Sequence, residues 1–413
     1  MIIDFEWLLA LNRQPTYHSM SHQRRSRKFL NFCVQTAPSR LSYDRGAMRL
    51  FKRLVIAALA FGVTGLSALP VRAQRAPLPL GTVVDTGKLQ SCPSGYYPGM
   101  SCFRGQVDNC QNASILGFTY GYKNPEGEVL GTVVFLEGGG GTNAYDYPTY
   151  AQTYLANGYQ VIYMAWDTDW ELTDGESGTN IKDAACRPAT VLNYLYDNFY
   201  TRGGMCAQGS SAGSGALGYA LAWYGSAGIL DNVEMLSGPV FGDIEQGCEV
   251  PNAPTVTVCA EGQYGCDGAP WPDSPAYVDG DENPIRRWSG QPSCNAGKTT
   301  SALVNSLWKG MSIIDGSDNA SFNYPQTALA GYLCSNIDSI QNNSAAQGEF
   351  FYQQFTSSFQ TAEYSLTRMN HCNGSEGVTN GQTPQGETGF EAISNHMLSA
   401  CVSRHKHKVH ERD

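Results

Sequence analysis

Several features that would indicate a membrane, a metal or a nucleic acid are missing from this 413-residue sequence. Its main apolar run, residues 54–69, is shorter than the roughly 20 residues that a membrane-spanning helix needs. No pair of CxxC motifs has the spacing of a zinc site, and the acidic stretches 279–282 and 315–318 lack the spacing of an EF-hand. The sequence therefore predicts neither a membrane span nor a bound metal.

The first 73 residues predict export. Met48 is followed by three basic residues, by the apolar run and by Val71-Arg72-Ala73, which has small residues at the two positions that a signal peptidase reads. We expect residues 48–73 to be a signal peptide and the mature protein to be secreted or periplasmic. Residues 1–47 are polar and rich in arginine, and they are either a misassigned start or a disordered basic arm.

Basic residues are scarce in the chain that follows. Residues 1–73 hold 11 of the 27 Lys and Arg but only 3 of the 37 Asp and Glu. The mature chain thus has 16 basic against 34 acidic residues, a net charge of −18. Such a surface repels nucleic acid and anionic lipid, so we expect no nucleic-acid partner and no membrane attachment after signal cleavage. An acidic polysaccharide is disfavoured for the same reason.

Twelve of the 13 cysteines follow residue 73, an even number that suits disulfides in an exported protein. They are scattered from Cys92 to Cys401, so up to six structural bridges are expected. Two pairs are close enough in sequence to be local bridges, Cys92 with Cys102 and Cys259 with Cys266. The full connectivity cannot be read from the sequence.

Short apolar runs alternate with helical patterns beyond residue 115, which is typical of one α/β domain with a mostly parallel central sheet and helices on both faces. The apolar runs predict strands at 116–122, 132–136, 160–165, 205–207, 233–236, 311–314 and 364–369. Spacing and length predict helices at 183–198, 212–223 and 390–403. We place this domain at residues 116–403.

Three segments stand outside this alternation. Residues 74–115, which precede the domain, are rich in Cys, Gly and Pro. Residues 242–298 contain many Gly and Pro, four cysteines and several aromatic residues, so they predict a disulfide-stapled insertion that is either lid-like or mere surface decoration. The charged tail, residues 404–413, is expected to be disordered.

The motif Gly209-Ser210-Ser211-Ala212-Gly213 lies between a predicted strand and a predicted helix. A serine hydroxyl is a weak nucleophile, so an enzyme exposes it on a strained strand-to-helix turn and places a base beside it. Small residues crowd this turn, as such a geometry requires. Ser211 is therefore the candidate nucleophile, and the pattern predicts an α/β-hydrolase fold.

A glycine run, Glu137-Gly138-Gly139-Gly140-Gly141, directly follows another predicted strand about 70 residues before Ser211. Glycines allow backbone N–H groups to turn toward a developing oxyanion without a Cβ in the way. We expect this run to form one side of an oxyanion hole, which the N–H of Ala212 would complete.

Histidine is scarce in the mature chain, which narrows the choice of a base to His371, His396, His405, His407 and His410. The last three lie in the charged tail. His396 lies in the predicted closing helix, on a side that we expect to face solvent, so it should be dispensable. His371 follows the last predicted strand and precedes that helix, which is where the chain order serine, acid, histidine places the base.

The acid of such a triad is sought after the predicted strand at 311–314. Two carboxylates compete there, Asp315 and Asp318. We prefer Asp318, because it lies past a glycine-containing turn and can reach back toward the imidazole. Asp315 remains the alternative, although local hydrogen bonds of its own loop can occupy its side chain.

These pieces together, 136–140 after a strand, the 209–213 motif, and then an Asp and a His in that order, resemble the pectin acetylesterase and Notum group of carboxylesterases. The likeness covers the catalytic elements and not the whole chain. It implies that Ser211 is the nucleophile, that Gly139, Gly140 and Ala212 donate to the oxyanion, that Asp318 is the acid and that His371 is the base. It implies no cofactor.

The resemblance implies a secreted serine carboxylesterase, and we favour removal of acetyl groups from a carbohydrate. The chain departs from that group in reading Gly141-Thr142-Asn143 after the glycine run and Ser214 after the serine motif. Polyester depolymerases and feruloyl-type esterases use the same machinery, so both remain alternatives for the substrate. A peptidase, an acyltransferase or a non-catalytic binding protein with a hydrolase fold are the other hypotheses.

Overall fold

The computed structural model describes residues 76–145, 147–171, 180–244, 309–314, 321–334, 342–355, 361–372 and 377–405. All of them belong to the compact unit Ala73–Asp413. The predicted signal peptide, residues 1–47, nearly all of the predicted insertion and most of the charged tail lie outside the described residues.

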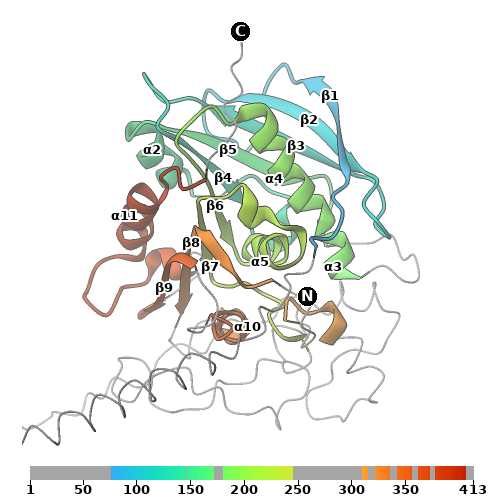
Figure 1. Cartoon of the computed structure of the whole chain (residues 1–413). Coiled ribbons are helices and arrows are strands. Elements are labelled where there is room, and N and C mark those ends of the chain that lie inside the picture. Colours follow the sequence, from blue (N-terminus) through green and yellow to red (C-terminus); the bar gives the residue numbers. More distant parts are fainter. Residues whose placement is uncertain are drawn as a thin grey trace, which may run out of the picture. The chain divides into compact units, whose positions relative to one another are not determined.

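A single nine-stranded sheet organises the described residues (Figure 1). Its strands, in chain order, are β1 (Thr82–Lys88), β2 (Ser101–Asp108), β3 (Leu116–Lys123), β4 (Gly131–Leu136), β5 (Tyr159–Trp166), β6 (Gly204–Ser210), β7 (Asn232–Leu236), β8 (Tyr324–Cys334) and β9 (Thr361–Met369). Their order in the sheet is β1-β2-β3-β5-β4-β6-β7-β8-β9. The first three strands and the β3–β5 pair are antiparallel, whereas the six strands from β5 to β9 run parallel.

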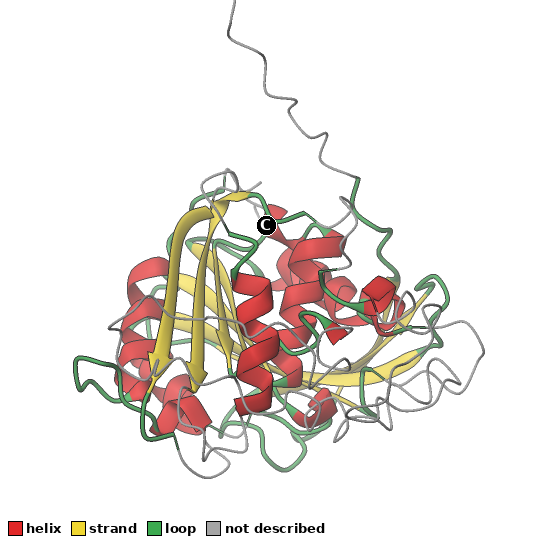
Figure 2. Cartoon of the chain, turned by 90° about the horizontal axis from the view of Figure 1, so that it is seen from below, coloured by secondary structure: helices red, strands yellow, loops and turns green. Residues whose placement is uncertain are grey.

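Helices cover both faces of the sheet (Figure 2). The long ones are α2 (Pro148–Ala156), α4 (Cys186–Phe199), α5 (Ala212–Tyr224), α10 (Asn342–Tyr352) and α11 (Gly389–Ala400), and α3 (Ile181–Ala184) is a single turn. Along β4, Val134 packs with α4 and α5, whereas Val133 and Phe135 pack with α2 and α11. Every residue of β4 is buried, because a strand with helices on both faces has no solvent-facing side.

Most of the predicted elements are confirmed, and one strand was misplaced. The structure contains strands at the six predicted positions other than 311–314, and it contains all three predicted helices with small shifts at their ends. Residues 311–314 instead end a helical turn and continue as bends, with Ile313 buried. Their apolar composition is that of a short strand, but it serves to pack them against α5. There the Trp223 indole donates to the carbonyl of Ile313.

Three strands were not predicted from the sequence. β1 and β2 lie in the segment 74–115, where Cys, Gly and Pro hid the strand pattern. β8 contains Pro325 and Gly331, two residue types that argue against a central strand, although its other residues are mostly buried. β8 occupies the place after β7 that the sequence pattern predicted for residues 311–314.

Four disulfides join the described residues: Cys92–Cys102, Cys110–Cys186, Cys206–Cys401 and Cys334–Cys372. The first confirms one of the predicted local pairs. The other predicted pair, Cys259 with Cys266, lies outside the described residues. Among the helices that the structure describes, none is long and apolar enough to cross a membrane. The described residues also contain no cluster of three or more metal-ligand side chains.

Candidate active site

Ser211 occupies a sharp turn between β6 and α5. Its backbone has φ 47° and ψ −114°, a conformation that a residue with a side chain rarely adopts. Two backbone hydrogen bonds hold the turn: the Ser211 N–H donates to the carbonyl of Leu236 at 2.9 Å, and the Gly215 N–H donates to the carbonyl of Ser211 at 3.0 Å. The turn therefore has the geometry of a nucleophile elbow at the carboxyl end of the parallel strands.

The glycines of the motif are required by close backbone contacts. A Cβ on Gly209 would lie 2.6 Å from the carbonyl oxygen of Gly213, and a Cβ on Gly213 would lie 2.2 Å from that of Leu136. Leu136 is the last residue of β4, so the start of α5 packs directly against the segment that leads into the glycine run. Both contacts exclude a side chain, which explains why small residues flank Ser211.

The glycine run lies beside Ser211, as the sequence predicted. A Cβ on Gly138 would lie 3.1 Å from the Cβ of Ser211. Residues Gly139–Gly141 form a 3₁₀ turn in which all three glycines have positive φ, from 58° to 77°. The Gly138 N–H donates to the Glu137 carboxylate at 2.8 Å, which holds the start of the turn.

The two glycines predicted to donate to an oxyanion have different surroundings. Gly139 is exposed, and a Cβ on it would have no neighbour within 4 Å. Gly140 is buried, its carbonyl accepts from the N–H of Trp170, and a Cβ on it would lie 2.5 Å from the carboxyl carbon of Asp169. Asp169 was not among the residues predicted from the sequence, although its position three residues after β5 puts it at the same edge of the sheet.

His371 stands at the same edge as Ser211, two residues beyond the end of β9. Its side chain is exposed and its φ is 56°. In the sheet, β7 and β8 lie between β6 and β9, so the imidazole can reach Ser211 only over the ends of these two strands. The structure thus brings Ser211, Ala212 and the glycine run together and places His371 on the edge that they occupy.

The expectation that His396 faces solvent is wrong. Its side chain is only 15% exposed, and its Nδ1 lies 2.8 Å from Oε1 of Glu234, a fully buried carboxylate of β7. Burial alone would lower the pKa of His396, but the hydrogen bond and charge of Glu234 outweigh burial and raise that pKa. The sequence could not reveal this pair, because its partners are 162 residues apart.

Although the His396–Glu234 pair has the hydrogen bond of a base and its acid, it lies in the wrong place for catalysis. Nε2 of His396 is buried and has no hydrogen-bond partner in the structure. Glu234 pairs in register with Gln208, three residues before Ser211 along β6, so it lies about 10 Å below the nucleophile. α11 packs on the sheet face opposite α5, the helix that Ser211 begins. His396 therefore belongs to the core.

Asp315 and Asp318 lie outside the described residues, but the segments that flank them are described. On one side, the Trp223 indole donates to Ile313; on the other, the Ser321 N–H donates to Ala222 at 2.9 Å. Both contacts are at the last turns of α5. Ala222 follows Ser211 by eleven residues of helix, which corresponds to about 16 Å.

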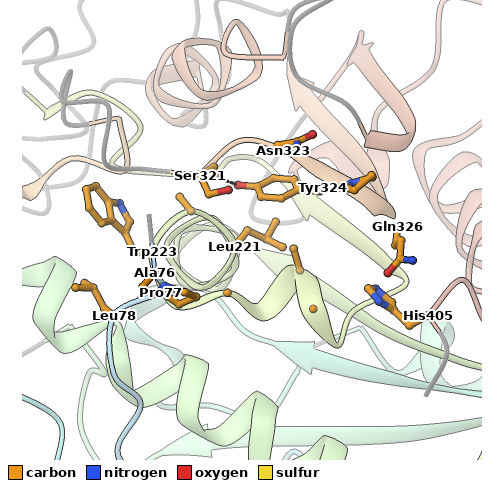
Figure 3. Close-up of a pocket in the computed structure, with 15 residues that line it drawn as sticks. Ala76, Pro77, Leu78, Leu221, Trp223, Ser321, Asn323, Tyr324, Gln326 and His405 are labelled. Carbon is orange, nitrogen blue, oxygen red and sulfur yellow. Dashed lines mark hydrogen bonds between the residues drawn. The ribbon is translucent and has the colours of Figure 1, made fainter. Parts of the chain in front are cut away.

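A cavity of about 270 Å³ lies at this far end of α5 (Figure 3). Leu221 and Trp223 of α5 line it together with Tyr324 at the start of β8 and His405 near the end of the described chain. Ser211 is at the opposite end of the same helix. The cavity is therefore separate from the edge that carries the candidate catalytic residues.

No family model and no curated protein matches this sequence. Similar solved structures include esterase B from Lactobacillus rhamnosis inhibited by a tributyrin phosphonate, with 12% identity, coverage of 86% of this chain and 97% of that chain, and a TM-score of 0.40. Acetyl xylan esterase from Paenibacillus sp. R4 has 14% identity, coverage of 78% and 90%, and a TM-score of 0.42. Pyrococcus horikoshii acylaminoacyl peptidase has 9% identity, coverage of 80% and 51%, and a TM-score of 0.43.

These likenesses are distant, with identities of 9–14%. Six parallel strands flanked by helices, with a strained serine between a central strand and the next helix, make up the predicted α/β-hydrolase fold.

Proposed function

We propose that this chain is a serine ester hydrolase in which Ser211 is the nucleophile and His371 is the base. The observation that carries the proposal is the strained turn at Ser211, held against a run of glycines with positive φ. Strain of this kind persists where it serves a function, and the combination provides a half-buried nucleophile next to backbone donors.

The reaction would proceed through an acyl-enzyme. His371 takes the proton of the Ser211 hydroxyl as its Oγ attacks the ester carbonyl, and the resulting oxyanion accepts from the N–H groups of Gly139, Gly140 and Ala212. Collapse breaks the ester bond, and the imidazolium returns its proton to the departing alcohol. A water molecule, deprotonated by His371, then attacks the acyl group; the bond to the Ser211 Oγ breaks, the imidazolium returns its proton to that oxygen, and the carboxylic acid leaves. One lost oxyanion donor typically costs about 3–4 kcal/mol of transition-state stabilisation.

For the acid, we propose a different part of the chain from the one predicted from the sequence. Asp315 and Asp318 are flanked on both sides by contacts with the far end of α5. β8 ends at Cys334, between the ends of β7 and β9, and Asp338 follows four residues later in the sequence. Cys334 is also bonded to Cys372, the residue after His371. We therefore propose Asp338, which also lies outside the described residues, ahead of Asp318.

A serine-selective fluorophosphonate probe and short-chain aryl esters test the nucleophile. We expect the wild type to be labelled and active and Ser211→Ala to be neither, whereas Ser210→Ala, which alters the adjacent serine, should keep both properties. Equal labelling of the wild type and Ser211→Ala would end the catalytic interpretation. A folded wild type that is inert toward these esters would favour the non-catalytic binding hypothesis.

The same esters identify the acid. We expect Asp338→Asn to lower kcat by several orders of magnitude, because the triad acid holds the imidazole in the correct tautomer. Asp318→Asn and Asp315→Asn should stay near the wild type. Loss of activity in Asp318→Asn alone would restore the choice made from the sequence.

For the substrate we propose an acetylated, neutral carbohydrate outside the cytoplasm. Four disulfides among the described residues are consistent with an exported protein, and the mature charge of −18 disfavours an acidic polymer such as pectin. Acetylated polysaccharides, feruloylated xylan and an aliphatic polyester, assayed side by side, test this choice. Acetate release from the first should dominate, and release from the polyester alone would overturn it.

A further inference from the structure

The short segment that carries His371 is fixed on both sides. Before it, Asn370 exchanges two backbone hydrogen bonds of 2.8 Å with Gln382. After it, Cys372 forms a disulfide with Cys334. Between these two points His371 adopts φ 56°, a left-handed conformation that costs free energy unless the surroundings impose it.

The strand that leads into this segment is weakly supported by itself. β9 is an edge strand whose one strand neighbour among the described residues is β8, and most of its residues are exposed or half-buried. Edge strands open locally more easily than central ones. β8, in contrast, lies between β7 and β9, and Cys334 is its last residue, opposite Met369 in the register.

The disulfide ties the base segment to this better-supported strand. Both cysteines are buried, with 1% of Cys334 and 2% of Cys372 exposed. The neighbouring chain packs on the bridge, because a Cβ on Gly381 would lie 3.1 Å from Sγ of Cys372 and 2.7 Å from Cβ of Met369. His371 therefore sits directly beside a covalent and closely packed anchor.

We infer that Cys334 and Cys372 are positioning residues for catalysis: their disulfide holds the backbone of His371 so that the imidazole meets Ser211. The inference rests on the proposed function, since it takes His371 to be the base. A misplacement of about 1 Å in a catalytic group can cost roughly 100-fold in rate. Loss of the bridge should therefore lower kcat by about 100-fold and change KM by less than about 3-fold, because the base acts in the transition state.

The experiment compares Cys334→Ser/Cys372→Ser with the matched variant Cys92→Ser/Cys102→Ser. The control removes a disulfide at the other end of the sheet, where Cys102 lies in β2. Both variants are tested in the wild-type and in the His371→Ala background, and circular dichroism confirms that each is folded. If Cys334→Ser/Cys372→Ser does not fold, the folded wild type is treated with a dithiol, which reduces the bridge to two thiols. The loss of kcat is then compared with the extent to which Cys334 and Cys372 become alkylated.

We expect kcat to fall in Cys334→Ser/Cys372→Ser and not in the control. We expect no further fall in kcat when Cys334→Ser/Cys372→Ser is combined with His371→Ala. If the disulfide had only a structural role, its loss would lower kcat by the same factor in both backgrounds. A folded first variant with wild-type kcat, or a fall equal to that of the control, overturns the positioning role while the proposed function stands. If His371→Ala itself keeps wild-type activity, the proposed function fails first.

Discussion

Replacing His396 with alanine tests how much the buried pair with Glu234 contributes to the fold. The wild-type contact joins Nδ1 of His396 to Oε1 of Glu234 at 2.8 Å, and the Glu234 side chain is fully buried. The variant leaves that carboxylate in the core without the imidazole. Breaking a buried pair by removing one partner typically costs about 3–5 kcal/mol, whereas an exposed helix position costs no more than about 0.5 kcal/mol. We expect the larger loss in the free energy of unfolding.

This loss should depend on pH, because Glu234 titrates. Burial raises its pKa above the ordinary value of 4.5, and loss of His396 removes an interaction that lowers it. A group whose pKa is raised by folding stabilises the protein below its unfolded pKa and loses that contribution as the pH rises. The variant should therefore come closest to the wild type near pH 4.5 and fall behind as the pH rises toward about 6.5.

His396 itself acts in the opposite direction above about pH 6.5 and narrows the gap in stability between the wild type and the variant. Its pKa is raised in the folded protein, so its stabilising contribution is complete below about pH 6.5 and is lost as the pH rises through the folded pKa. Urea unfolding followed by circular dichroism at pH 5, 6.5 and 8 measures both effects, the first between pH 5 and 6.5 and the second between pH 6.5 and 8. His371→Ala, an exposed histidine, serves as the control for stability.

Two results would refute this reasoning. One is a His396→Ala variant within about 0.5 kcal/mol of the wild type at pH 7, which would mean that the buried pair contributes almost nothing. The other concerns catalysis: folded His396→Ala should keep its ester hydrolysis, because Nε2 is buried in the core. If His396→Ala were inactive and His371→Ala active, the base would be His396 of α11.

Four further outcomes are expected. His371→Ala should lower kcat by several orders of magnitude in steady-state assays with stability nearly unchanged, and wild-type turnover would contradict its role as base. Gly213→Ala should lower the melting temperature and the activity, because its Cβ would lie 2.2 Å from a backbone oxygen; an unchanged melting curve would be evidence against the tight turn. Asp169→Asn should raise kcat/KM for an anionic aryl ester, because it removes a negative charge beside Gly140. The control Asp167→Asn should not raise it, because Asp167 pairs with Arg104. Equal effects of the two variants on kcat/KM would contradict this prediction. Thiol titration of denatured, unreduced protein should find few free thiols, and most of the twelve free would contradict the disulfide prediction.

The sequence by itself determined the features that are encoded within a few residues. Apolar runs such as 132–136 and 160–165 are buried on both faces in the structure, so their composition predicts them directly. The turn at Ser211 is equally local, because the glycines that permit it stand within two residues of the serine. The glycine run could be placed beside it because the carboxyl ends of parallel strands meet at one edge of a sheet.

Where a sequence segment was compatible with two conformations, only tertiary packing decided between them. Residues 311–314 are as apolar as a short strand, but they are buried against α5 as bends. β8 is interrupted by Pro325 and Gly331 in sequence, yet it is a central strand, because Pro325 lies near its start and the other residue makes room for the Tyr352 ring. Because β8 and not 311–314 is the strand after β7, the proposed acid is Asp338 and not Asp318.

Only the tertiary structure decided the roles of residues whose partners are remote in the chain. His396 follows a helical pattern that is compatible with a solvent-facing side chain, and its burial depends on Glu234, 162 residues away. Cys334 and Cys372 are 38 residues apart, and nothing near either cysteine in the sequence distinguishes that pairing from the others. A local pattern specifies which conformations a segment favours, whereas burial, charge pairing and disulfide choice depend on which segments the fold brings into contact.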